Sequence, residues 1–239
     1  MSLDMEHAIY KLVGSTGNGT SFAVEGGRLL LTAAHVVEER DDWLAVTGDP
    51  KGRHFGCKAR VGFVDTRNDV AFLEPDRPVP EALDLSPSGV VNDEEPLIVW
   101  DCPSWQDPEI PLPMRDAKLR RRAAVLSRRW VTSQGTERIG LAGHVEPGMS
   151  GGPVVSTSTG LVVGLVTALW RVDPAYVVET WWDVAESQYA DSAEEKEQYV
   201  ESLKAHLSLG LGIAVPSKSL IALLGTWRDS PNRTPHQSR

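Results

Sequence analysis

The chain has 239 residues, 41% of them hydrophobic and 24% charged, a balance that suits one or two globular domains and excludes a disulfide-stapled miniprotein. No apolar run approaches the roughly 18 residues that are needed to span a bilayer, so we expect no membrane contact. The net charge of −9 repels phosphate backbones, and we therefore expect no nucleic acid among its partners.

The cysteines and the N-terminal residues bear on the cellular location of the chain. Cys57 and Cys102 match no metal-ligand spacing and are too few for a secreted disulfide framework, so we interpret both as small buried hydrophobic residues. The segment Met1–Glu6 is acidic where a secretory signal is basic, and no apolar stretch follows it. These features predict a cytoplasmic chain, although a chain that had lost a signal peptide would read the same way.

From Ile9 to about Val166, short β-type runs alternate with Gly, Pro, Asn and Asp at the spacing of an all-β barrel or sandwich. The turn-forming and charged stretch 85–95 reads as a linker that divides these runs into two groups of similar size. The pattern predicts strands at Ile9–Val13, Ser21–Val24, Arg28–Leu31, Trp43–Thr47, Cys57–Val64, Val70–Leu73, Leu97–Asp101, Arg122–Ser127, Val154–Ser156, Leu161–Thr167 and Leu211–Val215.

Two later segments depart from the β rhythm. Asp183–Leu207 has helical spacing with a capping box at its centre, and predicts an inserted helix near 183–207. The acidic insert around it, 171–209, carries nine acidic residues against three basic ones. Pro216 and Ser217 precede a helical apolar pattern, which predicts a C-terminal helix near 218–227, and the polar tail 229–239 has nothing to pack.

The segment Gly148–Pro153 reads G-M-S-G-G-P and is the strongest chemical signal in the chain. Glycines on both sides of Ser150 allow a sharp turn that points backbone N–H groups at a developing oxyanion beside an exposed hydroxyl. The same string also occurs in ordinary glycine-rich turns and in the nucleophile elbow of α/β-hydrolases. Other residues must decide between these alternatives.

A serine nucleophile needs a histidine base and a carboxylate that orients it. His35 follows an apolar strand that ends in small residues, which leave the imidazole room at a cleft; alone, it fits a packed core histidine as well. Asp69 opens another apolar strand, and alone it fits a turn residue. The order His35, Asp69, Ser150 is that of chymotrypsin, whereas an α/β-hydrolase runs nucleophile, acid, base, and neither His206 nor His236 is placed to serve such an elbow.

With these residues in this order, the chain resembles the trypsin-like serine peptidases, most closely the HtrA-type and other bacterial members. The matching motifs are Gly19–Val24, Leu31–Val37, Asn68–Leu73, Gly148–Pro153 and Gly212–Pro216. The resemblance implies an all-β fold of two six-stranded antiparallel β-barrels of the chymotrypsin type. We expect the first barrel in residues 1–88, the second in 89–228 with the acidic insert 171–209, and a flexible tail in 229–239.

By this resemblance His35 is the general base and then the general acid, Asp69 orients it, Ser150 is the nucleophile, and the N–H groups of Gly148 and Ser150 form the oxyanion hole. The implied function is a serine endopeptidase that cleaves a protein or peptide substrate and needs no metal or organic cofactor. The alternative is a catalytically silent, peptide-binding module of a larger regulatory protein. A regulatory domain or partner protein is therefore part of both expectations.

The resemblance also places His144 at the base of the primary specificity pocket, with Val145, Thr167, Ala168 and Leu169 around it. Trypsin-type members keep an aspartate where this chain has His144, so we expect Lys and Arg to be disfavoured and a small or medium aliphatic residue to be preferred at P1. Recruitment of an acidic residue by protonated His144 is the alternative.

Two other features bear on partners and activation. Met149 stands where secreted digestive members have an aspartate that pairs with a new N-terminus, so we expect no activation by N-terminal cleavage. The basic run Lys118–Arg122, with Arg128 and Arg129 beyond it, is interpreted as loop and solvent-face charge rather than as a nucleic-acid patch.

Overall fold

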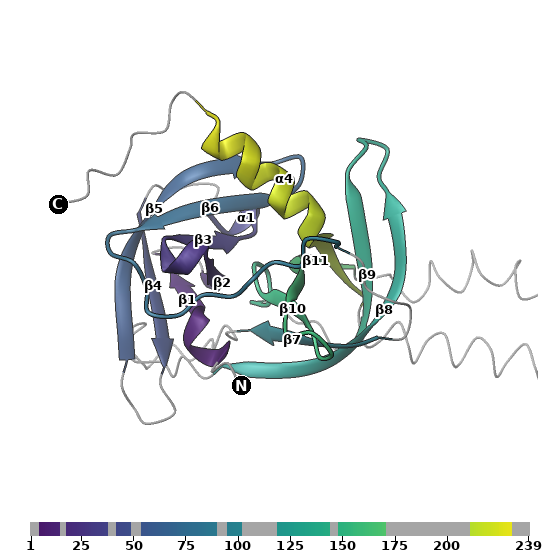
Figure 1. Cartoon of the computed structure of the whole chain (residues 1–239), viewed down its shortest axis with the longest axis horizontal. Helices are drawn as coiled ribbons and strands as arrows, with labels where there is room; N and C mark the ends of the chain where they lie inside the picture. Colours follow the sequence, from purple (N-terminus) through teal and green to yellow (C-terminus); the bar gives the residue numbers. More distant parts are fainter. Residues whose placement is uncertain are drawn as a thin grey trace, which may run out of the picture.

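The computed structural model describes residues 5–14, 18–37, 42–48, 54–89, 95–101, 119–143, 148–170 and 211–230. Its strands form two closed barrels of six strands each, with the orders β1-β2-β3-β6-β5-β4 and β7-β8-β9-β12-β11-β10, and every pairing is antiparallel. The predicted fold class, two six-stranded antiparallel barrels of the chymotrypsin type, is confirmed. Figure 1 shows the first barrel in purple and blue and the second in teal and green.

The first barrel contains β1 (Ile9–Val13), β2 (Asn18–Val24), β3 (Leu29–Thr32), β4 (Asp42–Gly48), β5 (His54–Asp65) and β6 (Val70–Pro75). The second contains β7 (Pro96–Asp101), β8 (Arg120–Val131), β9 (Glu137–Gly143), β10 (Pro153–Ser156), β11 (Val162–Trp170) and β12 (Leu211–Pro216). Short helical turns are η1 (Met5–Ala8), η2 (Glu25–Gly27) and α1 (Ala34–Val37), and α4 (Ser217–Arg228) is the longer C-terminal helix.

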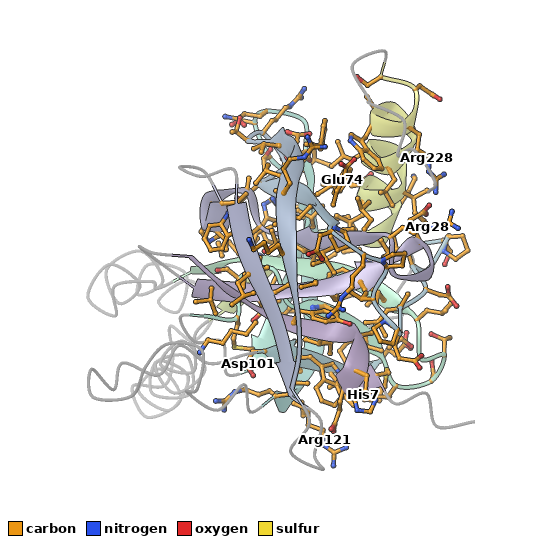
Figure 2. All side chains as sticks on the ribbon, turned by 90° about the vertical axis from the view of Figure 1, so that its left-hand side faces the viewer. His7, Arg28, Glu74, Asp101, Arg121 and Arg228 are labelled. Carbon is orange, nitrogen blue, oxygen red and sulfur yellow. The ribbon has the colours of Figure 1, made fainter. Side chains whose placement is uncertain are left out.

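Each strand predicted from the sequence has a counterpart, and several extend further than the pattern indicated, most of all β8. The strand β9 was not expected, because glycines at 140 and 143 interrupt its apolar pattern and weaken its β-propensity. Pairing on both sides compensates, since β9 lies between β8 and β12 in the closed barrel. The long basic strand β8 keeps Arg121, Arg128 and Arg129 exposed, as expected for solvent-face charges, and Figure 2 shows Arg121 projecting from the surface.

Strands β3 and β6 are apolar on both faces because two different cores meet there. Leu29 and Leu31 belong to a cluster that also contains second-barrel residues, whereas Leu30 belongs to the cluster inside the first barrel. Alternate residues of a strand point to opposite faces, so a continuous apolar run is what a strand with two buried faces needs. The first-barrel strands next to the site residues, β3 before His35 and β6 after Asp69, are therefore packed on both faces.

The helix α4 leaves the second barrel after β12 and packs against the first (Figure 1). Its Leu220, Leu224 and Trp227 lie in the cluster shared by the two barrels, and the Trp227 ring meets the Phe72 ring edge to face at 5.8 Å. Arg228, seen at the end of α4 in Figure 2, pairs with Glu25 of the first barrel. The C-terminal helix predicted near 218–227 is confirmed, and it joins the two barrels.

Several sequence-based predictions fall on residues that the structure does not describe. The inserted helix near 183–207, the acidic insert 171–209, the tail after residue 230 and Cys102 all lie outside the described residues. Cys57 is described and is buried, as expected. None of the helices in the described ranges is both long enough and apolar enough to cross a membrane.

Candidate active site

The two first-barrel candidates, His35 and Asp69, lie side by side at the ends of neighbouring strands. His35 is in α1, directly after β3, and Asp69 directly precedes β6. Because β3 and β6 are antiparallel with Thr32 opposite Ala71, the end of one strand meets the start of the other. This pairing brings together two residues that are 34 positions apart in the chain.

The Asp69 carboxylate binds His35 in two ways. His35 Nδ1 lies 2.8 Å from Asp69 Oδ2 and 3.1 Å from Oδ1, and the His35 backbone N–H donates to Oδ1 at 2.9 Å. One carboxylate therefore holds both the ring and the backbone of His35. When Nδ1 carries the proton it donates to Asp69, and Nε2 is left as the basic nitrogen. The His35 side chain is 45% exposed, so its ring is open to a substrate.

Asp69 occupies an unusual backbone conformation, with φ of 57°. This left-handed region is uncommon for residues other than glycine, although aspartate and asparagine tolerate it best. The turn before it is tied by Asp65, which accepts hydrogen bonds from the backbone N–H of Asn68 at 3.0 Å and from its side-chain amide at 2.8 Å. The sequence spacing Asp65 to Asn68 is a turn signal that sequence reasoning did not use.

The second-barrel candidate, Ser150, lies in the loop before β10, and this loop is bonded to the first barrel. The Thr20 backbone N–H donates to the Ser150 carbonyl at 3.0 Å, and the Thr20 hydroxyl donates to the Gly148 carbonyl at 2.7 Å. Thr20 is itself held by the Thr32 hydroxyl, which donates to the Thr20 carbonyl at 2.7 Å. Two hydrogen bonds thus join the loop on both sides of Met149 to strand β2.

Gly151 shows how closely this loop approaches the first barrel. It has a φ of 87°, and a Cβ at this position would overlap the Thr20 carbonyl and the Thr32 hydroxyl and lie 3.1 Å from the Ala33 nitrogen. Only glycine fits such a conformation and such an approach. Gly151, the residue after Ser150, therefore lies against Thr32 at the end of β3, three residues before His35. Met149, fully buried in the second-barrel core, anchors the loop from the other side.

The structure joins His35 and Asp69 by hydrogen bonds and brings the Ser150 loop to the same edge of the first barrel. Among the described residues it does not show a hydrogen bond from the Ser150 hydroxyl to His35. Such bonds are often long before substrate binds and tighten in the complex. Gly148 has a φ of 98°, and its N–H and that of Ser150 are the expected oxyanion-hole donors.

The five residues expected around the specificity pocket are only partly described. His144 and Val145 lie outside the described residues. Thr167 is buried in β11, with its hydroxyl 3.4 Å from the Ile213 carbonyl, and Ala168 is half-buried. The backbone of Leu169 pairs with Gly212 of β12. The strand expected to wall the pocket is therefore present.

Two further observations complete the chemistry of this region. Within the described ranges, no three His, Cys, Asp or Glu side chains are grouped as a metal site requires. Arg138 of β9 is the second-barrel cation near Asp69: burial lowers the pKa of its guanidinium, and Asp69 and Asp65 oppose this by raising it. Nothing in the sequence pattern identified Arg138, because only the folded chain brings β9 to this turn.

Comparison with known proteins gives a family and a set of structural neighbours. A family model described as a trypsin-like peptidase domain matches residues 19–165, which include His35, Asp69 and Ser150. The chain matches none of the curated proteins with which it was compared.

Three solved structures illustrate the likeness. The HtrA-type protease AlgW with a tripeptide has a TM-score of 0.64 at 17% identity, over 94% of this chain and 61% of that chain. Rv3671c from M. tuberculosis H37Rv, as a serine-to-alanine mutant in an inactive form, has 0.64 at 16% identity, over 96% and 91%. The serine endoprotease from Yersinia pestis has 0.62 at 15% identity, over 94% and 64%. At these identities the likeness shows the fold, and this chain spans 61% of the length of the AlgW structure.

Proposed function

The chain belongs to the trypsin-like peptidase family, and on this premise we propose that it is a serine endopeptidase that cleaves polypeptides through an acyl-enzyme. The observation that carries the proposal is the double hydrogen bond of Asp69 to His35, with the Ser150 loop bonded to the same barrel edge. If His35 were only a packed core histidine and Asp69 only a turn residue, neither would need the other as a hydrogen-bond partner.

In the proposed mechanism Asp69 keeps the proton of His35 on Nδ1, so that Nε2 can take the proton of the Ser150 hydroxyl as the oxygen attacks a peptide carbonyl. The N–H groups of Gly148 and Ser150 stabilise the oxyanion that forms. His35 then gives its proton to the leaving amine as the peptide C–N bond breaks, which leaves the acyl group on Ser150. In the second half His35 takes a proton from water as the water attacks the acyl group, and returns it to the Ser150 oxygen as the acid leaves. The roles need no cofactor beyond these side chains and the backbone.

We propose that the primary specificity pocket prefers a small or medium aliphatic P1 residue. His144 would lie at its base, with Val145, Thr167, Ala168 and Leu169 around it. Two observations support this preference: Ala168 is half-buried, and Val145, Ala168 and Leu169 are apolar residues. A basic P1 residue would be buried without a countercharge, which is unfavourable. A cleavage-site profile dominated by Lys and Arg would contradict this pocket, and one dominated by Asp and Glu at low pH would favour protonated His144.

Regulation and location extend the proposal. A regulatory domain or partner protein that acts together with these barrels stays a prediction. The cytoplasmic location stays a prediction from the N-terminal composition. The alternative function, a silent peptidase-fold module that binds peptides without turnover, differs in one property, the reactivity of Ser150.

Labelling with a fluorophosphonate probe tests the proposal. We expect the wild-type chain to be labelled at Ser150, and Ser150→Ala to lose labelling while it keeps its thermal midpoint of unfolding. Turnover of a peptide substrate should fall roughly a millionfold in Ser150→Ala or His35→Ala, without further loss in the double variant, because the two residues act as a unit. A folded wild-type chain that binds peptides but is never labelled would favour the silent module.

A further inference from the structure

The turn that carries Asp69 is bonded to the second barrel by two arginines that reach in opposite directions. Arg67, between β5 and β6, donates through Nη2 to the carbonyl of Gln134 in the β8–β9 hairpin. Arg138, on β9, donates through Nη2 to the carbonyl of Arg67 at 3.1 Å. Each arginine thus binds the backbone of the segment that carries the other. We call this pair the arginine staple.

The second-barrel side of the staple is a well-ordered turn. Within residues 132–136 the N–H of Thr132 donates to the Thr136 carbonyl at 2.9 Å, the N–H of Gly135 donates to the Thr132 carbonyl at 2.9 Å, and the two threonine hydroxyls are 2.7 Å apart. Gly135 has a φ of 74°, as a tight turn of this kind requires. The carbonyl that Arg67 contacts is therefore fixed by its own hairpin, which projects beyond the rest of the second barrel in Figure 1.

The staple is placed where it acts on Asp69 rather than on the protein in general. Arg138 is half-buried, and its guanidinium is coupled to Asp69 and Asp65, the two carboxylates of the turn. Asp69 follows Arg67 by two residues and has a φ of 57°, a conformation that persists in residues other than glycine only where the surroundings impose it. The staple bonds this turn to the second barrel at Arg67.

We propose that Arg138 is a positioning residue, which fixes the turn at Arg67 from the second barrel and so holds the Asp69 carboxylate against His35. This inference rests on the proposed function for its effect on catalysis. Since a displacement of 1 Å in a catalytic group can lower a rate about a hundredfold, a loosened turn should reduce turnover without contact between Arg138 and substrate. The β8–β9 hairpin thereby supports the acid–base pair of the other barrel.

The test compares Arg138→Met with a matched control, Arg129→Met. Arg129 is an exposed arginine of the adjacent strand β8, so its variant loses the same charge without loss of the staple. Two properties are measured in each variant: the exchange rate of the His35 amide, which donates to Asp69 Oδ1, and the steady-state kinetics, kcat and KM, with a peptide substrate. Arg138→Lys keeps the charge and one donor and serves as the conservative variant.

In Arg138→Met we expect the His35 amide to exchange about tenfold faster and kcat for a peptide substrate to fall about tenfold with KM within twofold of wild type. Arg138→Lys should recover most of both, and Arg129→Met should change neither. If Arg138→Met does not fold, Arg67→Met serves instead, because it keeps Arg138 and removes the bond to Gln134. In Arg67→Met we expect the His35 amide to exchange about threefold faster and kcat to fall about threefold. Unchanged exchange at His35 in a folded staple variant, or equal acceleration of core amides throughout both barrels, would overturn the proposal.

The amide measurement separates this proposal from the proposed function. A wild-type chain that is not labelled by the fluorophosphonate contradicts the endopeptidase, while faster His35 exchange in Arg138→Met still supports the staple. A wild-type chain that is labelled normally, together with variants that neither exchange faster nor react more slowly, contradicts the staple alone.

Discussion

In the first barrel a carboxylate side chain organises the candidate site, whereas in the second barrel the backbone does. Asp69 receives both the ring and the backbone N–H of His35. Ser150 is positioned by carbonyls that accept from Thr20 and by Gly151, which fits only because it lacks a Cβ. The difference predicts two kinds of variant: changes of the His35 and Asp69 side chains, which alter chemistry and leave the fold intact, and changes of the glycines that shape the Ser150 loop, which alter the fold.

The largest effect on chemistry is expected for Asp69→Asn. An asparagine has nearly the same shape, but its side-chain NH2 donates a hydrogen bond to Nδ1 where the carboxylate accepted one. The imidazole therefore adopts the tautomer that leaves Nε2 protonated. By analogy with other triads, kcat should fall about 10⁴-fold while the fold is retained. Steady-state kinetics and thermal unfolding of the same preparation measure both. A loss of stability that accompanies the loss of kcat would contradict the separation of chemistry from fold in the first barrel.

The sequence predicted the candidate residues better than their supports, for a physical reason. His35, Asp69 and Ser150 belong to local motifs whose glycines and apolar strands are visible in a single stretch of chain. Arg138 donates to a carbonyl 71 positions away, and the Thr20 hydroxyl donates to one 128 positions away. Such contacts depend on the closure of both barrels, and a backbone carbonyl accepts from any donor whatever its residue type, so no sequence pattern marks them.

The strands show the same division between local and distant causes. Strands with a continuous or alternating apolar run, such as β3 and β6, were found from the sequence, because burial of their side chains is a local demand. β9 was not predicted because glycines at 140 and 143 interrupt its apolar pattern, so its strand form depends on pairing with the distant strands β8 and β12. All five specificity residues remain predictions, and two of them, His144 and Val145, lie outside the described residues.

The largest effect on the fold is expected for Gly151→Ala in the second barrel. The new Cβ would overlap the Thr20 carbonyl in a conformation with a φ of 87°, and moving the backbone would break the bonds of the Ser150 loop. We expect a loss of about 3 kcal/mol in the free energy of unfolding. Gly160→Ala is the control, because it has a φ of 71° but open space around it, and should cost only about 1 kcal/mol. Urea unfolding compares them; equal losses would mean that the close approach to Thr20 is unimportant.

Alkaline pH should act on the first barrel through Cys57. Burial raises the pKa of this thiol to about 11, from an ordinary value near 9.0, so the folded chain keeps it neutral where the unfolded chain ionises. The stability it contributes is present below about pH 9 and is lost as the pH rises toward 11, by up to about 2 kcal/mol. Urea unfolding between pH 8 and 10.5 should compare Cys102→Ser with the double variant Cys102→Ser/Cys57→Ala. The difference between their free energies of unfolding should become smaller as the pH rises. A constant difference would contradict the raised pKa.

The smallest effect compares a hydrogen bond between the barrels with one inside the first. The hydroxyls of Thr20 and Thr32 each donate to a carbonyl at 2.7 Å, but Thr20 reaches Gly148 in the second barrel and Thr32 reaches Thr20. Replacement of either by valine removes one such bond at nearly constant volume and should cost about 1 kcal/mol of stability. In Thr20→Val the Gly148 carbonyl loses the hydroxyl that holds it, and the peptide unit beside the expected oxyanion donor can turn. Only Thr20→Val should therefore also slow fluorophosphonate labelling at Ser150, by about a few-fold. Equal labelling rates in the two variants, at equal stability, would mean that the Ser150 loop holds its shape without the Thr20 hydroxyl.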